Sequence, residues 1–482
     1  MYCIKKCLIN KQIIKPIIRN NIIVGKLCQT IANMPRPRSL PLVGTKLDLL
    51  AAGSGKNLHE YIDSRHKQLG PIFCEKLGGN VPLVFISHPT MIRTLFLNLE
   101  GKYPAHILPD PWILYEKING SKRGLFFMSG EEWAKNRSIM NKLVLKDDSE
   151  KWLENPIKST IDNFLQKWKS KAITGCFTPA LESDLYRLST EVIINVLLGS
   201  NSSIKTSKHF EELLGFFSEN VKKVFQTTTK LYGLPVSLCR YLNLKIWRDF
   251  EESVDLSIGI ARKIVQEILN NHHDSNGLVK RLCNENVSEE DIKRIAADFV
   301  MAAGDTTAYT SLWILFLLAK NEDVRNDIRG KHKNYVKNVI KETMRLFPVA
   351  PFLTRILPKQ SVLGSYVINQ DTPIIASIYT SGRDEQNFSK ANMFLPYRWD
   401  RNDPRKKELL NHVQSASVPF ALGTRSCVGK KIAMLQMTEF IYQIVNNFDF
   451  TCSNSADVKA ITSLVLVPDR DVKLTVSLLK KV

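Results

Sequence analysis

Apolar residues recur every three or four positions along much of the middle of the chain, which is the period of an amphipathic helix. Four segments show it: Ile157 to Trp168, Leu185 to Leu198, His209 to Phe225 and Trp247 to Asn270. Short apolar runs at Pro71 to Phe73 and Val81 to Ser87 predict strands instead. The pattern therefore predicts a mainly α-helical protein with a small β-region.

A further long helix is predicted over residues 288–320, beginning at a capping box of Ser288 and Asp291. Asp298 and Asp305 are the only charges along its apolar middle. A helix with so few charges has no polar face to present to water, so we expect it to be buried nearly all round.

The middle of this helix combines small residues with an acid and a hydroxyl, and reads Ala302-Ala303-Gly304-Asp305-Thr306-Thr307. Small residues allow a flat cofactor to approach, and a carboxylate beside a hydroxyl can pass protons to a bound ligand in a dry site. A point where two helices cross would use the same residues, with Thr306 bonding back to a carbonyl one turn earlier. The residues alone leave both interpretations open.

The composition predicts a large hydrophobic core and a reducing environment. The chain has 482 residues, of which 44% are apolar, enough to bury a sizeable core. Its nine cysteines form no Cys-x-x-Cys pair and no spacing typical of a disulfide framework. We therefore expect a reducing compartment, with one cysteine as a ligand and eight as structural residues.

The formal net charge of +20 is unevenly distributed. Residues 1–47 carry six lysines and three arginines and no acid. Such an excess of positive charge can bind nucleic acid, an anionic membrane or an acidic protein partner. The sequence shows no nucleic-acid motif and no interleaving of aromatic and basic residues, so the last two partners are favoured.

Residues 1–34 have the composition of a mitochondrial transit peptide, basic and free of acids, although rich in lysine and poor in serine. A disordered basic tail is the alternative. Lysines and arginines interrupt the apolar residues, so no run approaches the ~20 residues of a membrane-spanning helix. A proline-rich stretch from Met34 to Pro41 then leads into the predicted folded domain, residues 35–482.

The stretch from Phe420 to Gly429 reads Phe-Ala-Leu-Gly-Thr-Arg-Ser-Cys-Val-Gly. Gly423 and Gly429 give the backbone freedom to fold around the sulfur of Cys427 and to point N–H groups at it. Arg425 can bind a carboxylate by charge-assisted hydrogen bonds. Seen alone, the cysteine is equally typical of a buried free thiol in an ordinary turn.

The whole pattern Phe-x-x-Gly-x-Arg-x-Cys-x-Gly, beginning at Phe420, resembles the cysteine loop of the cytochrome P-450 family of haem-thiolate monooxygenases. The helical Ala-Gly-Asp-Thr-Thr stretch is also similar to that family, except that Ala303 stands where glycine is usual. The resemblance runs from about residue 35 to the C-terminus. It implies the P-450 fold, haem b with Cys427 as the axial thiolate ligand of the iron, and delivery of protons by Asp305 and Thr306 while dioxygen is activated.

The same resemblance implies roles for more residues. The haem-binding set is Cys427, Arg425, Trp133, Arg137, Arg355 and Phe420, in which the cationic residues and the tryptophan clamp the haem propionates. A buried structural triad is formed by Glu342, Arg345 and Arg398. Taken alone, Trp-x-x-x-Arg is typical of packing with a surface charge, and Glu-x-x-Arg of a solvated helix face.

Two lysine pairs point to the mitochondrial branch of the family, namely Lys337 with Lys341 and Lys430 with Lys431. Charge runs are usually solvated faces. In mitochondrial members such cations dock an acidic [2Fe-2S] ferredoxin, which receives electrons from NADPH through ferredoxin reductase. Together with residues 1–34, they imply a mitochondrial enzyme on the matrix side of the inner membrane, associated with the membrane surface.

Several stretches outside these motifs resemble the insect members that act on ecdysteroids: Leu49 to Gly53, Tyr61 to Gln68, Gly124 to Met128, Ile246 to Glu251 and Pro348 to Phe352. That resemblance implies hydroxylation at C2 of 2-deoxyecdysone or 2,22-dideoxyecdysone. An apolar pocket formed by Met301, Val349 and the loop-like region from Ala105 to Gly124 suits a sterol, but also many other apolar molecules. Another sterol or a foreign compound is the alternative substrate. A haem protein that only binds its ligand is a second alternative, which Asp305 and Thr306 argue against.

Overall fold

The computed structural model describes residues 29–41, 43–77, 81–120, 123–199, 208–232, 234–270, 276–330 and 333–480. The predicted transit peptide, residues 1–34, therefore lies almost wholly outside the described residues. The predicted domain boundary near residue 35 falls just inside them.

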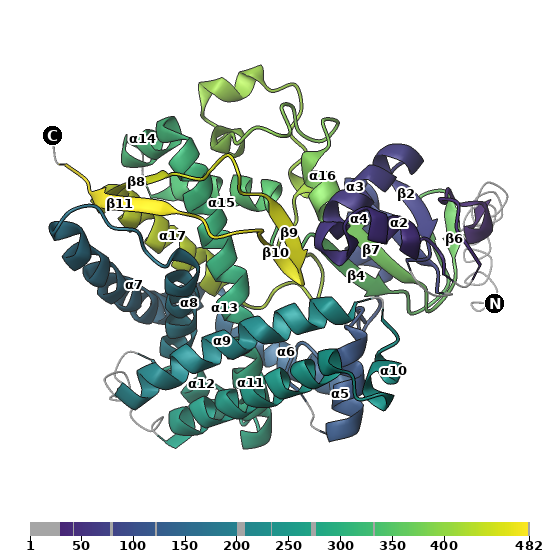
Figure 1. Ribbon diagram of the computed structural model, residues 1–482, viewed down its shortest axis with the longest axis horizontal. Helices are drawn as coiled ribbons and strands as arrows, with labels where there is room; N and C mark the ends of the chain where they lie inside the picture. The colour runs from purple at the N-terminus through teal and green to yellow at the C-terminus, as the bar shows by residue number, and fades with distance from the viewer. Residues whose placement is uncertain are drawn as a thin grey trace, which may run out of the picture.

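The chain forms a large helical part and a smaller part rich in strands, seen at the right of Figure 1. The α-helices are α2 (Lys46–Ala51), α3 (Leu58–Leu69), α4 (Pro89–Thr94), α5 (Asp110–Asn119), α6 (Gly130–Met140), α7 (Glu150–Ile173), α8 (Leu181–Leu198), α9 (Lys208–Leu231), α10 (Val236–Tyr241), α11 (Lys245–Asn270), α12 (Leu278–Asn284), α13 (Glu289–Lys320), α14 (Glu322–Gly330), α15 (Asn334–Leu346), α16 (Ile378–Arg383) and α17 (Lys430–Asn447). None of these described helices is long and apolar enough to cross a bilayer.

The helices predicted from the apolar period are confirmed. The four amphipathic segments lie within α7, α8, α9 and α11. The long helix is α13, and the hydroxyl of Ser288 accepts a hydrogen bond from the N–H of Asp291 at 3.2 Å, which caps its first turn.

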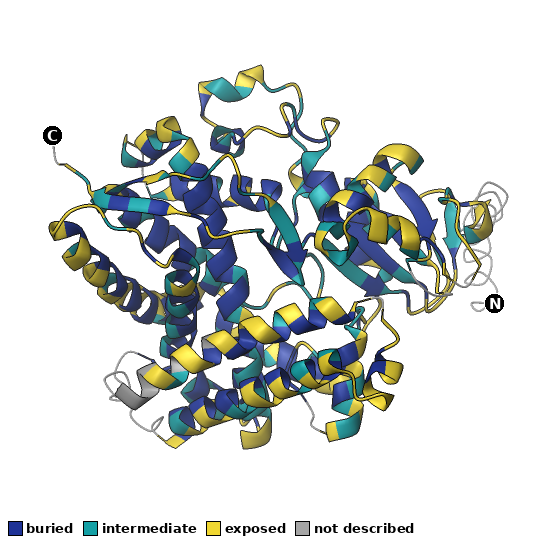
Figure 2. Cartoon of the chain, in the orientation of Figure 1, coloured by how far each residue is buried: buried dark blue, intermediate teal, exposed yellow. Residues whose placement is uncertain are grey.

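Helix α13 is the centre of the helical part and packs against α8, α11, α15 and α17 (Figure 1). Every residue from Thr307 to Leu318 is buried, and much of the helical core around α13 is dark blue in Figure 2. One face is different: Ala302 is exposed, and Ala303 and Thr306 are half-buried. The predicted all-round burial therefore holds for the second half of α13 and fails at its small residues.

The strands are β1 (Gln29–Thr30), β2 (Ile72–Glu75), β3 (Leu83–Ile86), β4 (Phe352–Ile356), β5 (Ser361–Leu363), β6 (Tyr366–Ile368), β7 (Pro373–Ser377), β8 (Phe448–Cys452), β9 (Ala460–Ser463), β10 (Val465–Pro468) and β11 (Leu474–Leu478). The largest sheet has the order β2-β3-β7-β4, with β3 and β7 parallel and the other pairs antiparallel. Side chains alternate between its faces, so Phe85 packs with α3 while Val84 and Ile86 pack on the other side. The predicted strands at residues 71–73 and 81–87 correspond to β2 and β3.

The loop-like region predicted from Ala105 to Gly124 is wrong in part, because α5 occupies Asp110–Asn119. Its proline and glycine residues mark the two ends of the helix. Pro111 lies in the first turn, where no backbone N–H is needed, and Gly120 ends the helix with a φ of 61°.

Trp112 and Tyr115 are buried on α5 and tie it to its neighbours. The indole N–H of Trp112 donates to the hydroxyl of Thr228 on α9 at 3.1 Å. The hydroxyl of Tyr115 donates to Asp255 on α11. Both side chains therefore support the packing of α5.

Candidate functional site

The cysteine loop closes on itself just before α17. The N–H of Cys427 donates to the carbonyl of Phe420 at 2.9 Å, and α17 begins at Lys430. Cys427 has exposed surface although its sulfur lies deep in the protein. Burial raises the pKa of its thiol, while the N–H groups of Gly429 and Lys430 and the charge of Arg137 favour the thiolate. The loop thus surrounds the sulfur with the groups that a metal-bound thiolate uses.

The two glycines of the loop serve different purposes. Gly423 has a φ of 78°, and a Cβ there would lie 2.2 Å from the carbonyl oxygen of Phe96 and 2.3 Å from a carboxylate oxygen of Glu100. Only glycine fits at this position. Gly429 has a φ of −81°, and its nearest neighbour to an added Cβ is the sulfur of Cys427 at 3.9 Å. Backbone freedom, expected at both glycines, is therefore needed only at Gly423.

Thr306 lies on the uncovered face of α13. Its hydroxyl donates to the carbonyl of Ala302 at 2.9 Å, which is the back-bonded geometry considered from the sequence. Ala302 itself is exposed, and Ala303 beside it is half-buried. The small side chains therefore leave one turn of an otherwise buried helix accessible.

Asp305 faces a different neighbour, α8. It is buried, and its Oδ2 has no hydrogen-bond partner among the described residues. Burial and the nearby charge of Glu182 raise its pKa to about 7. Gly304 allows this close packing of α8, because a Cβ there would lie 2.6 Å from the ring of Tyr186. Asp305 and Thr306 are thus adjacent in sequence but contact different parts of the protein.

Arg425 lies against α6 and the segment before it. Its guanidinium lies 4.5 Å from the ring centre of Trp133 and donates to the carbonyls of Phe126, at 3.1 Å, and Met128. Arg137, one turn after Trp133, donates to the carbonyl of Ser426 at 2.6 Å. The predicted members Trp133, Arg137 and Arg425 are therefore brought together around the residues that precede Cys427.

Arg355, on β4, joins the loop through a residue that sequence reasoning missed. Its Nε lies 2.8 Å from Oε2 of Glu100 in a buried ion pair. The other oxygen of Glu100 accepts from the N–H of Thr424 at 2.7 Å and from its hydroxyl at 2.9 Å. A lone glutamate in no motif carries no sequence signal for this role.

The cationic cluster fits the two propionates of a haem. Among the described residues, Nη2 of Arg355, Nε of Arg425 and Nε2 of His106 are buried without a hydrogen-bond partner. Burial and the charges of Arg355 and Arg137 lower the pKa of Arg425 to about 10. Burial and the charges of Arg425 and Arg355 lower the pKa of His106 to about 3. Buried donors crowded by like charges are satisfied by an added anion, which a propionate carboxylate supplies. His106 is a second residue that no motif indicated.

Glu342, Arg345 and Arg398 form one buried cluster. Glu342 lies 2.7 Å from Nη2 of Arg345 and 2.8 Å from Nε of Arg398, and it also accepts from the indole of Trp399 at 2.8 Å. Burial opposes ionisation of Glu342, but these hydrogen bonds and charges hold its pKa below the ordinary value. The cluster joins α15 to the chain that leads into the cysteine loop.

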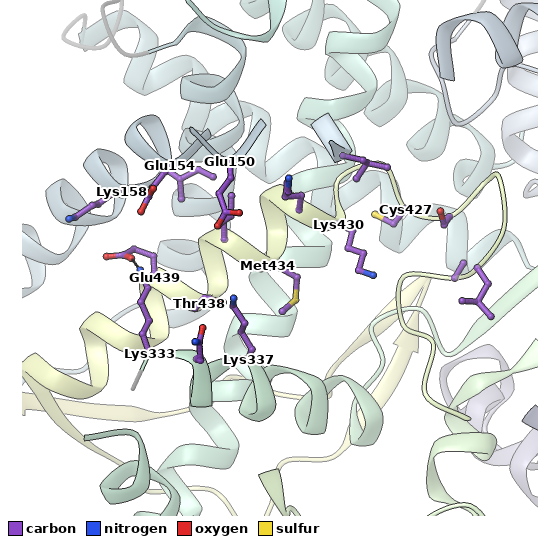
Figure 3. A pocket seen from close by; sticks show the side chains of 18 of the residues that line it. Glu150, Glu154, Lys158, Lys333, Lys337, Cys427, Lys430, Met434, Thr438 and Glu439 are labelled. Atoms are coloured by element: carbon purple, nitrogen blue, oxygen red, sulfur yellow. Dashed lines mark hydrogen bonds and ion pairs between the residues drawn. The ribbon is translucent and has the colours of Figure 1, made fainter. Parts of the chain in front are cut away.

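A groove of about 740 Å³ lies between α7, α15 and α17, with Cys427 among its lining residues (Figure 3). Lys337 and Lys430 are exposed along it. Burial and the charges of these two lysines lower the pKa of Lys341, which lies one helical turn after Lys337 on α15. Lys431 is different, because it donates to the carbonyl of Lys146 and, at 3.0 Å, to the hydroxyl of Ser149.

Comparison with known proteins agrees with this geometry. A model of the cytochrome P450 family matches residues 34–476. The mitochondrial cytochrome P450 315a1 of Drosophila melanogaster is 39% identical over 92% of this chain and 88% of its own length. The mitochondrial cholesterol side-chain cleavage enzyme of Ovis aries is 30% identical, over 87% of this chain and 84% of its own. The mitochondrial 1,25-dihydroxyvitamin D(3) 24-hydroxylase of Rattus norvegicus is 27% identical, over 92% of this chain and 89% of its own length.

The chain therefore belongs to the cytochrome P450 family. It is a haem-thiolate monooxygenase, and its mainly helical fold with small sheets is the one that the cysteine loop predicted.

Proposed function

We propose that this protein hydroxylates a steroid, at C2 of 2-deoxyecdysone or 2,22-dideoxyecdysone, in the synthesis of a moulting hormone. The observation that carries the proposal is the 39% identity to the Drosophila protein along almost the whole chain. The five stretches that resemble the insect Shadow protein of the ecdysteroid pathway lie outside the haem motifs and support it further. Relatives named for cholesterol and vitamin D agree with a substrate of sterol type.

In this proposal Cys427 ligates the haem iron, and the loop residues from Phe420 to Gly429 position its sulfur. Arg425, Arg355, Arg137 and Trp133 hold the propionates, joined by His106. When bound, the haem supplies activation of dioxygen and insertion of one oxygen atom into a C–H bond.

Asp305 and Thr306 supply protons in this proposal. The pKa of Asp305, raised to about 7 by burial and Glu182, allows the carboxyl group to hold and release a proton near neutral pH. The hydroxyl of Thr306 lies on the exposed turn of α13 and can exchange its hydrogen bond to Ala302 for one to a ligand. The exposed Ala302 leaves room for that ligand beside it.

Electrons come from NADPH through ferredoxin reductase and a mitochondrial [2Fe-2S] ferredoxin. Lys337, Lys341 and Lys430 form the proposed docking site, because Lys337 and Lys430 line the groove beside the cysteine loop and the charges of both act on Lys341. Lys431 belongs to the same sequence cluster, but its ammonium group donates to the carbonyls of Lys146 and Asp147 and to the hydroxyl of Ser149.

The proposed location is the matrix side of the mitochondrial inner membrane, reached through the transit peptide of residues 1–34. Exposed apolar residues gather around α10, including Leu238, Tyr241 and Leu242, with Tyr241 exposed by 85%. Such a patch, next to Arg240, suits the surface of an anionic membrane. Aspartate at Leu238 and Tyr241 should therefore abolish flotation with anionic vesicles without changing the haem spectrum.

Turnover with ferredoxin, ferredoxin reductase, NADPH and 2-deoxyecdysone tests the proposal. We expect a product heavier by one oxygen atom, with the new hydroxyl at C2 by mass fragmentation and NMR. Cholesterol and vitamin D compounds serve as competing substrates. Hydroxylation of a competitor alone would overturn the substrate, and activity supported only by a microsomal flavoprotein reductase would overturn the partner and the location.

A further inference from the structure

Arg123 is a buried guanidinium with an unused donor. It is 8% exposed, and its Nη1 has no hydrogen-bond partner among the described residues. Its carbon Cζ lies 4.1 Å from the ring centre of Trp112 and 3.9 Å from that of Phe127. Within the described part of the chain, the one acceptor of its Nη2 is a weak one, the sulfur of Met301 at 3.8 Å. The two rings hold the plane of the guanidinium, but they do not replace the hydrogen bonds that it loses on burial.

The backbone at Arg123 is fixed to α13. Arg294 donates to the carbonyl of Arg123 through Nε at 3.0 Å and Nη2 at 2.7 Å. The next residue, Gly124, packs so closely that an added Cβ would lie 2.3 Å from the carbonyl oxygen of Arg294. Asp298 accepts from the N–H of Phe126 at 3.1 Å. The side chain of Arg123 is therefore presented from a rigid support.

This support lies between the two parts of the candidate site. Met301 immediately precedes the exposed Ala302 on α13 and lies about 7.5 Å along the helix axis from Thr306. On the other side, the carbonyls of Phe126 and Met128 accept hydrogen bonds from Arg425. Arg123 thus contacts α13 beside the accessible turn and is carried by the same segment that contacts the propionate clamp.

The carboxylates near Arg123 leave its guanidinium without a hydrogen-bond acceptor. Burial lowers the pKa of Arg123, and the charges of Asp298 and Glu116 oppose that shift only in part. Neither carboxylate forms an ion pair with it among the described residues, so Nη1 still lacks an acceptor. A carbonyl or hydroxyl oxygen on an apolar molecule meets that need.

We propose that Nη1 of Arg123 donates a hydrogen bond to a carbonyl or hydroxyl oxygen of the substrate and thereby fixes which carbon faces the iron. The inference rests on the proposed function, because it takes an oxygen-bearing steroid as substrate. A fixed, buried donor rejects an analogue that lacks the matching oxygen, since the donor is then left unpaired.

Spectral titration of the haem-loaded enzyme with two probes tests this inference. The probes are 2-deoxyecdysone, which carries oxygens, and 5α-cholestane, a steroid hydrocarbon, both delivered in cyclodextrin. Arg123→Met should weaken binding of 2-deoxyecdysone by about 10- to 100-fold and that of 5α-cholestane by less than about threefold. Because Met fills the slot between the rings without a buried charge, the melting temperature of the ligand-free variant should be unchanged or higher.

Two further variants separate anchoring from packing. Arg123→Lys keeps the charge between the rings but not the guanidinium geometry, so this variant should also bind 2-deoxyecdysone more weakly. It provides the test if Arg123→Met fails to fold. Arg281→Met removes an arginine that lies 4.5 Å from the ring centre of a different tryptophan, Trp152, and should leave both titrations unchanged. Product analysis of the Arg123 variants should show hydroxylation at more than one carbon.

The outcomes are distinct. Equal weakening of both probes, together with a lower melting temperature, would show a structural role and overturn the anchor. Unchanged binding of 2-deoxyecdysone by folded Arg123→Met would also overturn the anchor, but leave the proposed function standing. Failure of the wild-type enzyme to bind either steroid would overturn the proposed substrate class and the anchor together.

Discussion

The guanidinium of Arg355 and the carboxylate of Glu100 form a buried ion pair, with Nε and Oε2 2.8 Å apart. The same carboxylate holds Thr424, three residues before Cys427. Strand β4 and Glu100, which are distant in sequence, are thereby joined to the loop that presents the thiolate. Glu100 therefore helps to fix the position of Cys427, although it lies outside the cysteine motif.

Glu100→Gln keeps the shape of this side chain but removes its charge. Breaking a buried ion pair typically costs about 3–5 kcal/mol, because it leaves the partner charge uncompensated. We expect a loss of stability of that size in urea unfolding and a lower haem content after purification. Asp249→Asn, which breaks the exposed pair with Lys245, should cost less than about 1 kcal/mol. Equal stability of the two variants would contradict the role of Glu100.

Gly423→Ala should disrupt the cysteine loop. The left-handed backbone conformation and the overlap with Phe96 and Glu100 together predict a cost of about 3 kcal/mol or more, with loss of bound haem. Gly429→Ala is the matched control, because its φ suits any residue and its added Cβ meets only an ordinary contact. Haem content and thermal unfolding of both variants check the prediction, and a tolerated alanine at 423 would refute it.

Asp305→Asn should change how stability depends on pH. The fold raises the pKa of Asp305 from 3.8 to about 7, so the folded protein retains a proton that the unfolded chain has released. Asp305 therefore contributes most to the free energy of unfolding at low pH. Its contribution falls by up to about 4 kcal/mol as the pH rises from about 4 to about 7.

Asparagine stays neutral, so the melting temperature of Asp305→Asn should rise relative to that of the wild type as the pH increases through this window. The exposed carboxylate of Asp323 provides a control, since Asp323→Asn should not reproduce this trend. A constant difference between Asp305→Asn and the wild type from pH 4 to pH 8 would show that Asp305 does not retain its proton.

The three docking lysines predict a dependence on salt. Lys337→Glu and Lys430→Glu should each raise the KM for ferredoxin about tenfold at low salt, with a smaller effect at high salt, where surface charges are screened. The affinity for the steroid should not change. Lys431→Met should leave the KM for ferredoxin nearly unchanged, because the ammonium group of Lys431 is bound by carbonyls of its own chain. An equal effect at Lys431 would mean that docking does not distinguish these lysines.

Much of the helical fold could be predicted, because burial imposes its period on the sequence. The segment in α11 repeats its apolar residues every three or four positions, and the capping residue Ser288 marks the start of α13. Helix α5 was missed because Pro111 and Gly120 are typical of loops, although at the two ends of a helix they mark its limits.

The candidate site could be predicted only where residues form a motif. The spacing around Cys427 indicated the loop, Arg425 and the glycines. Glu100 and His106 are single residues in unremarkable sequence, and only the tertiary fold brings them to the clamp. Lys431 shows a further limit, since a pattern of charges does not tell which ammonium group points outward.

Ligation of iron by the sulfur of Cys427 can be examined in the reduced carbon monoxide spectrum of the wild-type protein and of Cys427→Ser. Thiolate ligation predicts the strongly red-shifted absorption band of this family in the wild type, and its loss in the serine variant together with loss of hydroxylated product. A serine variant that kept the same band and formed the same product would contradict the assignment of Cys427 as the iron ligand.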